Sequence, residues 1–248
     1  MEKEEYRKHF ELEESFWWFM GRREIILNVL KRIKRKKLKI LDVGCGTGFN
    51  LQIFQNYGTS FGCDISKEAL DYCLKRSLEK VVQADGQKLP FRTGSFDLVI
   101  LLDVLYHKRV KSDIKVLQEV SRVLKNKGYL LVTDSAFAFL WSRHDIAFHA
   151  RERYNKKTLR KRLEKAELSI EKISYFNFFL FSPVVLMRFL ERLGLRKKSK
   201  AESDLKKINT GVNKVLFSFL KLEAFLIQHL NFPFGSSLIS LARKYDIP

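Results

Sequence analysis

Three glycines and two later acids are the residues of this chain best suited to hold a ligand. Gly44, Gly46 and Gly48 let the main chain turn sharply and let a ligand approach bare backbone. Asp64 follows about twenty residues later, where a carboxylate can accept hydrogen bonds from both hydroxyls of a ribose. Asp85 stands where a carboxylate can accept a hydrogen bond from an adenine amino group. The pattern predicts a site for a ligand that contains adenosine.

Candidate proton acceptors occur later in the chain. His107, His144 and His149 are three of its five histidines. Imidazole titrates near neutral pH, so these groups can take the proton of a hydroxyl or amine nucleophile. Asp103 is a fourth candidate, because it stands with His107 at the end of a strand-like segment. We predict that the catalytic base is among these four residues.

The segment from Arg143 to Arg153 also has two structural interpretations. His144, Asp145 and His149 could ligate a metal. Metals that activate hydroxyls are usually held by more carboxylates than this, so we predict no metal site. Arg143, Asp145 and Arg153 could instead form a network of salt bridges within a loop.

Strands must position these residues. Strand-like apolar segments lie at 40–43, 59–63, 81–84, 95–107 and 129–133, and helical patterns at 66–76 and 112–124 separate some of them. This alternation predicts a mostly parallel sheet with helices on both faces, and ligands of such sheets lie at the carboxyl ends of the strands. A dinucleotide site is disfavoured because the glycine spacing is G-x-G-x-G rather than G-x-G-x-x-G.

Five motifs follow one another between residues 40 and 135. They are LDVGCGTG at 41–48, Asp64, ADGQKLPF at 84–91, FDLVILLDVLYH at 96–107 and VLKNKGYLLVTD at 123–134. In these motifs the chain resembles the class I S-adenosylmethionine-dependent methyltransferases of the subgroup called type 11. The resemblance implies an α/β, Rossmann-like seven-stranded sheet with the last strand antiparallel. It also implies S-adenosyl-L-methionine as cofactor and methyl transfer as the reaction.

The resemblance assigns roles to individual residues. Gly44, Gly46 and Gly48 would frame the methionine part of the cofactor, Asp64 would hold the ribose, and Asp85 with Gly86 would face the adenine. Arg22 is a candidate for binding the methionyl carboxylate. The predicted cofactor-binding set also includes Asp42, Cys45, Ile65, Gln87 and Asp103.

The flanking segments divide the chain. We expect an N-terminal lid and helix at 1–38, the cofactor-binding core at 39–177, a helical insertion at 178–232 and the last strand at 233–248. The aromatic run Phe16-Trp17-Trp18-Phe19 is interpreted either as the edge of a lid or as a helix stapled to the sheet. A helix is predicted over 24–38, where apolar residues recur at helical spacing.

Composition limits the setting of the protein. The chain has 248 residues and a formal net charge of +19, which implies an anionic partner, either nucleic acid or an anionic membrane surface. Its three cysteines show no metal-binding spacing and are interpreted as reduced thiols of a cytoplasmic protein. No amino-terminal signal peptide is recognisable, because the chain opens with charged residues.

The acceptor is expected to be small or lipid-linked and hydrophobic, methylated on oxygen or carbon. Two apolar segments at 176–190 and 212–230 flank the basic sequence at 196–200, a combination typical of helices that lie on the inner face of an anionic membrane. A homodimer that buries these segments is an alternative. RNA is a less favoured acceptor, because residues 102–106 lack the Asn/Asp-Pro-Pro-aromatic sequence of enzymes that methylate base amino groups. A non-catalytic cofactor-binding scaffold is a further alternative.

Overall fold

Strand β1 (Leu38–Val43) lies in the interior of a parallel sheet in the computed structural model, which describes residues 3–195, 205 and 208–245. Ile40 and Leu41 have no exposed surface. A continuous apolar run is what a parallel strand needs, because neighbouring strands cover its edges and helices cover its faces. β2 (Gly58–Asp64) and β4 (Phe96–Leu102) pair with β1 on either side.

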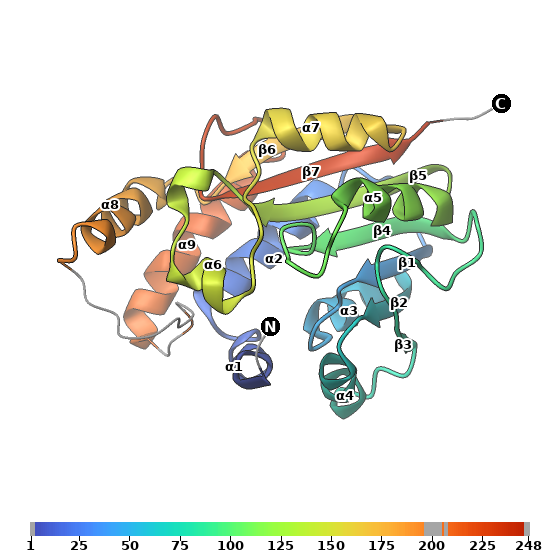
Figure 1. Cartoon of the computed structure of the whole chain (residues 1–248), viewed down its shortest axis with the longest axis horizontal. Helices are drawn as coiled ribbons and strands as arrows, with labels where there is room; N and C mark the ends of the chain where they lie inside the picture. Colours follow the sequence, from blue (N-terminus) through green and yellow to red (C-terminus); the bar gives the residue numbers. More distant parts are fainter. Residues whose placement is uncertain (1–2, 196–204, 206–207, 246–248) are drawn as a thin grey trace.

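The sheet formed by the described residues has seven strands in the order β3-β2-β1-β4-β5-β7-β6 (Figure 1). Its other members are β3 (Val81–Gln83), β5 (Leu124–Ser135), β6 (Leu168–Phe176) and β7 (Ser237–Lys244). β7 runs antiparallel to both β5 and β6, whereas β1 to β5 are mutually parallel. The predicted α/β sheet with its antiparallel last strand is confirmed.

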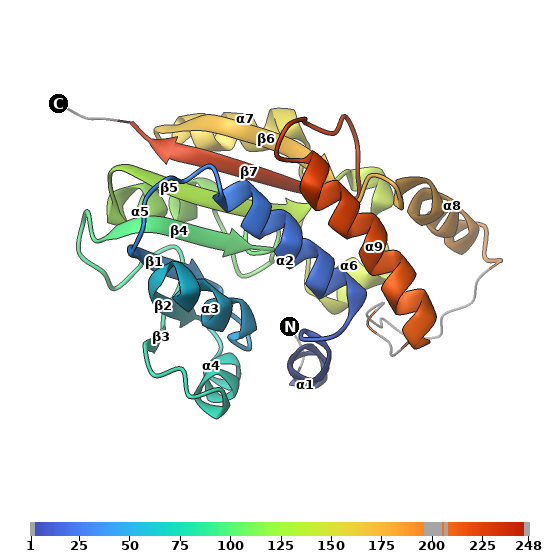
Figure 2. The same cartoon turned by 180° about the vertical axis from the view of Figure 1, so that it is seen from behind.

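Helices cover both faces of this sheet. α5 (Asp113–Val123) and α7 (Lys156–Lys165) lie on one face, and α2 (Trp17–Leu30), α3 (Phe49–Phe54) and α9 (Thr210–Leu226) lie on the other (Figures 1 and 2). Further helices are α1 (Lys3–Leu12), α4 (Lys67–Lys75), α6 (Arg143–Ala147) and α8 (Phe181–Arg192), with 3-10 turns at Gln55–Tyr57 and Ala138–Leu140. Ser66 and Ser112 cap α4 and α5 through their side-chain oxygens.

Helix α2 shows that the predicted bounds of 24–38 are wrong. The helix begins at Trp17 and ends at Leu30, and an exposed stretch of mostly basic residues leads to β1. The aromatic run forms its first turn, where Trp18 stacks on Phe176 with 5.8 Å between ring centroids. Packing of aromatics therefore sets the start of the helix, and the repeated cations that follow Leu30 do not extend it because like charges on adjacent turns repel.

The predicted insertion contains α8 and α9. Both helices lie at the end of the molecule to which β4 and β5 point (Figures 1 and 2). Neither helix, nor any other helix in the described part of the chain, has the length and apolar character needed to cross a membrane. The insertion follows β6 and leads into β7, as the sequence predicts.

Helix α9 packs along α2 (Figure 2). Gly21 allows this contact, since a Cβ built on it would lie 2.4 Å from the Cβ of Leu220. Asn213 of α9 accepts a hydrogen bond from the Trp17 N–H (2.9 Å) and donates one to the Ser15 carbonyl (2.9 Å). The Asn213 side chain thus caps the start of α2, and it joins the insertion to the N-terminal segment.

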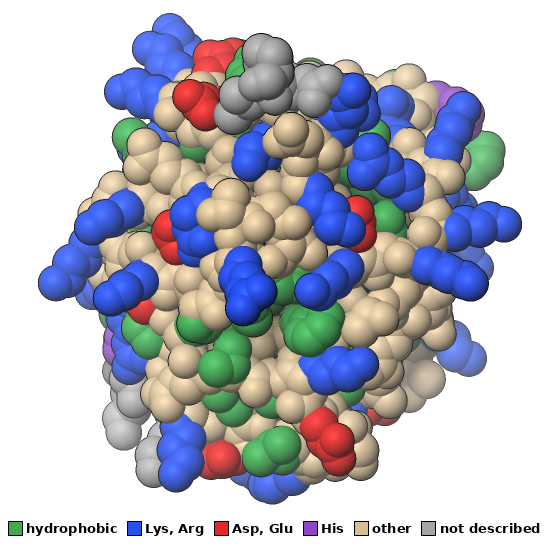
Figure 3. Space-filling model, turned by 90° about the vertical axis from the view of Figure 1, so that its right-hand side faces the viewer, with side chains coloured by type: hydrophobic (Ala, Val, Ile, Leu, Met, Phe, Trp, Pro, Cys, Tyr) green, Lys and Arg blue, Asp and Glu red, His purple; other side chains and the backbone are tan. Residues whose placement is uncertain are grey.

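Lys and Arg side chains are prominent at the end of the molecule where the parallel strands begin (Figure 3). The exposed run from Lys34 to Lys37 precedes β1 at this end. Arg35 and Arg243 lie over the ring of Tyr129, at 6.0 and 5.4 Å from its centroid. In a parallel sheet the carboxyl ends of the strands lie at the opposite side, so this basic end faces away from them.

Replacing Gly21 tests the close contact of α2 with α9. We expect Gly21→Ala to lower the free energy of unfolding by about 1–3 kcal/mol, because the added methyl group would overlap Leu220. Ser218→Ala on the exposed side of α9 should leave stability within about 0.5 kcal/mol of the wild type. Urea unfolding followed by circular dichroism measures both, and equal effects of the two changes would contradict the packing described here.

Candidate active site

A cavity of about 700 Å³ lies at the carboxyl ends of β1, β2 and β4. Its wall combines the glycine turn at 44–47 with residues of the N-terminal helices and of the insertion. The predicted site residues that line it are Arg22, Asp42, Gly44, Cys45, Gly46, Asp64, Ile65, Asp85, Gly86, Asp103, His107 and His144. Gly48, Gln87 and His149 are not among its lining residues.

The glycines of the turn have different uses. Gly46 has a positive φ of 55°, and a Cβ built on it would meet no atom within 4 Å, so its backbone faces open space. Gly48 also has a positive φ (88°), but a Cβ there would lie 2.9 Å from the Cys73 Sγ. Gly46 therefore leaves room for a ligand, whereas Gly48 permits close packing of the turn on α4.

Asp64 holds the turn in place. Its carboxylate accepts hydrogen bonds from the Gly46 N–H (3.0 Å) and the Ser66 N–H (2.8 Å). Burial raises the pKa of Asp64 in spite of these two donors. The carboxylate lines the cavity, so it can accept further hydrogen bonds from a ligand.

Asp42 is a buried acid with an unused oxygen. Its Oδ1 has no hydrogen-bond partner among the described residues. Burial, with the nearby charge of Asp64, raises the pKa of Asp42 to about 7. A buried carboxylate of this kind is expensive when it is ionised and unpaired, so the cavity favours a ligand that brings a positive charge.

Gln87 acts on the cavity through other residues. Its N–H donates to the Asp85 Oδ1 (2.8 Å), and its Oε1 accepts from the N–H groups of Lys111 and Ser112 (3.0 and 3.1 Å). The amide thus ties the loop after β3 to the loop after β4. Asp85 lines the cavity and is held in place by this connection.

Arg22 forms an ion pair with Asp103 inside the cavity. Arg22 is buried, and its Nε has no hydrogen-bond partner in the part of the chain that the structure describes. Asp103 has a positive φ of 57°, and its N–H donates to the Thr133 carbonyl (2.9 Å), which aims the side chain away from the sheet. Arg22, the candidate for binding the methionyl carboxylate, therefore lies beside a carboxylate of the protein itself, that of Asp103.

The structure separates the candidate histidines. His107 and His144 line the cavity, while the ring of His149 stacks on that of His107 with 6.0 Å between centroids. Burial lowers the pKa of His107 to about 4, so its imidazole is neutral at neutral pH and can accept a proton. The assignment of the catalytic base to one of these histidines stays a prediction.

Asp145 belongs to a salt bridge. Its two oxygens accept from the Nε and Nη2 of Arg153 at 2.7 and 2.9 Å, and both side chains are buried. The Ser142 N–H also donates to it, which caps α6. Because both carboxylate oxygens are used in this way, the loop salt bridge is the interpretation that the geometry supports for Asp145 and Arg153.

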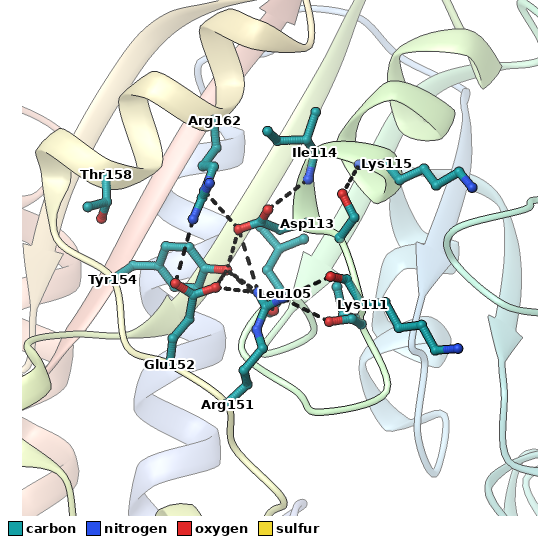
Figure 4. A network of polar contacts seen from close by, with 12 residues as sticks. Leu105, Lys111, Asp113, Ile114, Lys115, Arg151, Glu152, Tyr154, Thr158 and Arg162 are labelled. Carbon is teal, nitrogen blue, oxygen red and sulfur yellow. Dashed lines mark hydrogen bonds and ion pairs between the residues drawn. The ribbon is translucent and has the colours of Figure 1, made fainter.

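A second polar network supports the loop after β4 (Figure 4). The Arg151 N–H donates to the Tyr106 carbonyl (2.6 Å), and its guanidinium donates to the Val110 carbonyl (2.9 Å). Asp113 accepts a hydrogen bond from the Tyr154 hydroxyl and forms an ion pair with Arg162, both at 2.9 Å. The network fixes the loop that carries Asp103 and His107.

The N-terminal segment closes over the turn through one buried acid. Glu13 accepts from the Thr47 hydroxyl (2.6 Å) and from Arg76 (2.9 Å). Arg76 also pairs with Glu14 at 2.7 Å, but the Glu14 side chain is 56% exposed. Glu13 therefore connects the lid to the glycine turn.

Tyr6, His9 and Glu13 are among the cavity residues that sequence reasoning missed. All three stand in an acidic segment whose charges resemble those of a solvated helix. Burial lowers the pKa of His9 to about 3, and its ring lies 5.0 Å from that of Phe19. The repeated aromatics nearby were the one signal that this segment packs over the site.

Comparison with known proteins identifies the domain that carries the glycine turn and the acids of this cavity. Residues 41–132 match the family model described as a methyltransferase domain. The chain therefore contains a class I methyltransferase domain, a class whose cofactor is S-adenosylmethionine. The match spans the glycine turn, Asp64, Asp85, Asp103 and His107, and leaves the lid and the insertion outside.

Relatives of the methyltransferase domain have different substrates in their names. The tRNA (carboxymethyluridine(34)-5-O)-methyltransferase alkbh8 of Xenopus tropicalis is 37% identical over 94 residues, 38% of this chain and 15% of that protein. The malonyl-[acyl-carrier protein] O-methyltransferase of Legionella pneumophila is 34% identical over 121 residues, 45% of this chain and 42% of that protein. The chain thus spans less than half the length of either.

The fold extends beyond the matched domain. A chain from the complex with the Haloferax volcanii Trm112 methyltransferase activator covers 98% of this chain and 94% of its own length, with a TM-score of 0.62. Its sequence identity is 16%, so this likeness concerns the fold alone.

Glu13 and Glu14 form a matched pair for testing the lid connection. We expect Glu13→Ala to lower the free energy of unfolding by about 1–3 kcal/mol, because it leaves the Thr47 hydroxyl and part of Arg76 buried without an acceptor. Glu14→Ala should cost less than about 1 kcal/mol, as exposed ion pairs contribute little. Urea unfolding measures both, and similar losses would rule out a special role for Glu13.

Asp42 predicts a pH dependence of stability in the cofactor-free protein. Its folded pKa of about 7 lies above the value of 3.8 for a free side chain, so the folded state holds a proton that the unfolded state releases between these pH values. Stability should therefore fall as pH rises through this window, by at most about 1.4 kcal/mol per pH unit.

Asp42→Asn removes the titrating group and should reduce this slope. Urea unfolding of both proteins at pH 5 and pH 8 gives the comparison. If the free energies of unfolding of the two proteins differ by the same amount at both pH values, the prediction is wrong. That result would show that Asp42 has the same pKa in the folded and the unfolded chain.

Proposed function

We propose that the protein transfers the methyl group of S-adenosylmethionine to a small or lipid-linked hydrophobic acceptor, with oxygen or carbon as the favoured acceptor atom. The observation that carries this proposal is the composition of the single cavity described above. Its acids and glycine turn form one part, and aromatic and aliphatic side chains of the lid and insertion form the other.

The acid-rich part fits the cofactor. Gly46 leaves open space beside bare backbone, and a buried oxygen of Asp42 has no hydrogen-bond partner among residues 3–195, 205 and 208–245. Asp64 and Asp85 would hold the ribose and the adenine, and Arg22 with Asp103 would hold the charged groups of the methionyl part. When bound, the cofactor supplies a methyl group already activated by a positively charged sulfur.

The apolar part fits a hydrophobic acceptor. Trp17 and Trp18 of the lid and Phe148 line it from one direction, and Met187 and Leu216 of the insertion line it from another. Polar side chains such as Asn177 and Arg188 also line the cavity, so a polar group of the acceptor would have to meet one of them to replace its hydrogen bonds to water. We therefore infer that the acceptor presents an apolar body with a single reactive group.

The protein's own contribution to the reaction is orientation and removal of a proton. The cavity walls hold the acceptor against the cofactor site, which lowers the entropic cost of alignment. His107 is neutral and lines the cavity, so it can take the proton of an acceptor hydroxyl. Asp103 and His144 are the other candidates within the cavity wall.

RNA is the second candidate for the acceptor. The similarity to a tRNA methyltransferase favours it. The exposed basic run before β1, however, lies at the end of the sheet opposite the cavity, so it is not placed to guide a polynucleotide to the reacting groups. The apolar cavity wall supports the hydrophobic acceptor over RNA.

Cofactor binding and product analysis test the proposal together. Calorimetry should detect binding of S-adenosylmethionine, at least tenfold weaker in Asp64→Ala because hydrogen bonds to the ribose are lost. Asp71→Ala, which removes an exposed acid of α4, should bind like the wild type. The protein is then incubated with a cell extract and with S-adenosylmethionine that carries a tritiated methyl group. The label should appear in the lipid fraction of that extract.

Three other outcomes would overturn parts of the proposal. Absence of cofactor binding contradicts the methyltransferase activity itself. Label in RNA rather than lipid establishes the second candidate. Cofactor binding without transfer of label to any fraction indicates a scaffold that binds the cofactor without catalysis.

A further inference from the structure

The outward surfaces of α8 and α9 carry many exposed apolar side chains. On α8, Leu186, Phe189 and Leu193 are 58%, 57% and 56% exposed. On α9, Val215 and Phe225 are 58% and 61% exposed. Exposed apolar side chains gathered in this way normally mark a surface that binds a partner.

The same two helices form the cavity wall on their inward sides. Val184 and Met187 of α8 and Leu216 of α9 line the cavity. Ile208 and Val212 line it as well, although they are 38% and 51% exposed. The edge of the cavity therefore reaches the apolar outer surface at the start of α9.

Aromatic side chains continue this surface beyond the insertion. Phe139 is 50% exposed and Phe234 is 39% exposed. Phe181, at the start of α8, contacts both, with ring centroids 6.4 and 5.2 Å apart. We call the exposed apolar side chains of α8 and α9, together with Phe139 and Phe234, the insertion face.

We propose that the insertion face docks on an anionic lipid surface and that the acceptor enters the cavity from the lipid, past Ile208 and Val212. This inference rests on the proposed function, because it specifies how a hydrophobic acceptor reaches the site. Phenylalanine and leucine side chains suit the boundary between headgroups and acyl chains. The helices need not cross the membrane for this purpose.

Charge favours a lipid surface over a second copy of the chain. In a dimer joined at the insertion face, the exposed Lys214 and Lys221 of one copy would lie near those of the other, and like charges repel. Lys214 and Lys221 are exposed on α9, next to the apolar positions. Arg192 is exposed at the end of α8. Lysine and arginine beside an apolar helix surface are attracted to anionic headgroups.

Vesicle sedimentation with the full chain tests this proposal. We expect binding to phosphatidylcholine vesicles that contain phosphatidylglycerol, and weaker binding to pure phosphatidylcholine. Phe189→Ser and Phe219→Ser should each lower the lipid partition coefficient roughly tenfold, since each removes a large apolar side chain from the boundary. Leu74→Ser on α4 is the matched control, because Leu74 is also 57% exposed but lies outside the insertion face.

Calorimetry with S-adenosylmethionine shows whether each variant is folded and separates the two proposals. If the wild type binds the cofactor but not the vesicles, or if Leu74→Ser weakens vesicle binding as much as Phe189→Ser, the lipid surface is refuted and the proposed function stands. Sedimentation equilibrium provides a second test. A stable dimer that Phe189→Ser dissociates, without vesicle binding by the wild type, would assign the insertion face to a second copy. Failure to bind the cofactor would instead refute the proposed function.

Discussion

Desolvation of carboxylates at one end of a parallel sheet is the constraint on which the site depends. Parallel strands bring their carboxyl ends together, and here those ends carry Asp42, Asp64 and Asp134, all buried. Burial raises the pKa of each of these acids, in Asp134 well above its ordinary value. Arg22 is placed among them and pairs with Asp103. The site therefore has an excess of buried acids, and the sulfonium and ammonium groups of S-adenosylmethionine would relieve it.

Such a site requires covers that exclude water, and both ends of the chain supply them. Glu13 joins the N-terminal segment to the glycine turn through Thr47. Gly21 lets α9 of the insertion approach α2, and Asn213 caps the start of that helix. The buried Glu223 of α9 in turn accepts a hydrogen bond from the Phe179 N–H at the entry to α8 (3.0 Å). Lid and insertion are therefore connected to one another as well as to the core.

The sequence was sufficient for the sheet, because its strands are continuous apolar runs that end at polar residues. It also pointed to the acids and the glycine turn that line the cavity, since they follow a regular spacing along the chain. It could not separate residues that touch a ligand from those that hold the site together. Gln87 braces two loops, Gly48 packs on Cys73, and His149 lies against His107. Their residue types suit both uses, and only tertiary contacts distinguish them.

Other misses arose where tertiary packing outweighs local pattern. The helix predicted over 24–38 begins at Trp17 because aromatic contacts with Phe176 fix its first turn. His9 belongs to a segment whose charges resemble a solvated surface, and its place in the cavity depends on Phe19 and Phe148. No local signal reports a contact made across the fold.

The net charge of +19 describes the surface of this protein rather than its site. Basic residues are prominent at the end where the strands begin, whereas the opposite end holds the buried acids. Two surfaces with different properties therefore lie at opposite ends of one sheet. A polyanion is attracted to the basic end, but the acids of the cavity repel it from the reacting groups. A hydrophobic acceptor carries no charge that either end could repel, and the apolar wall that the insertion adds gives it a place to bind.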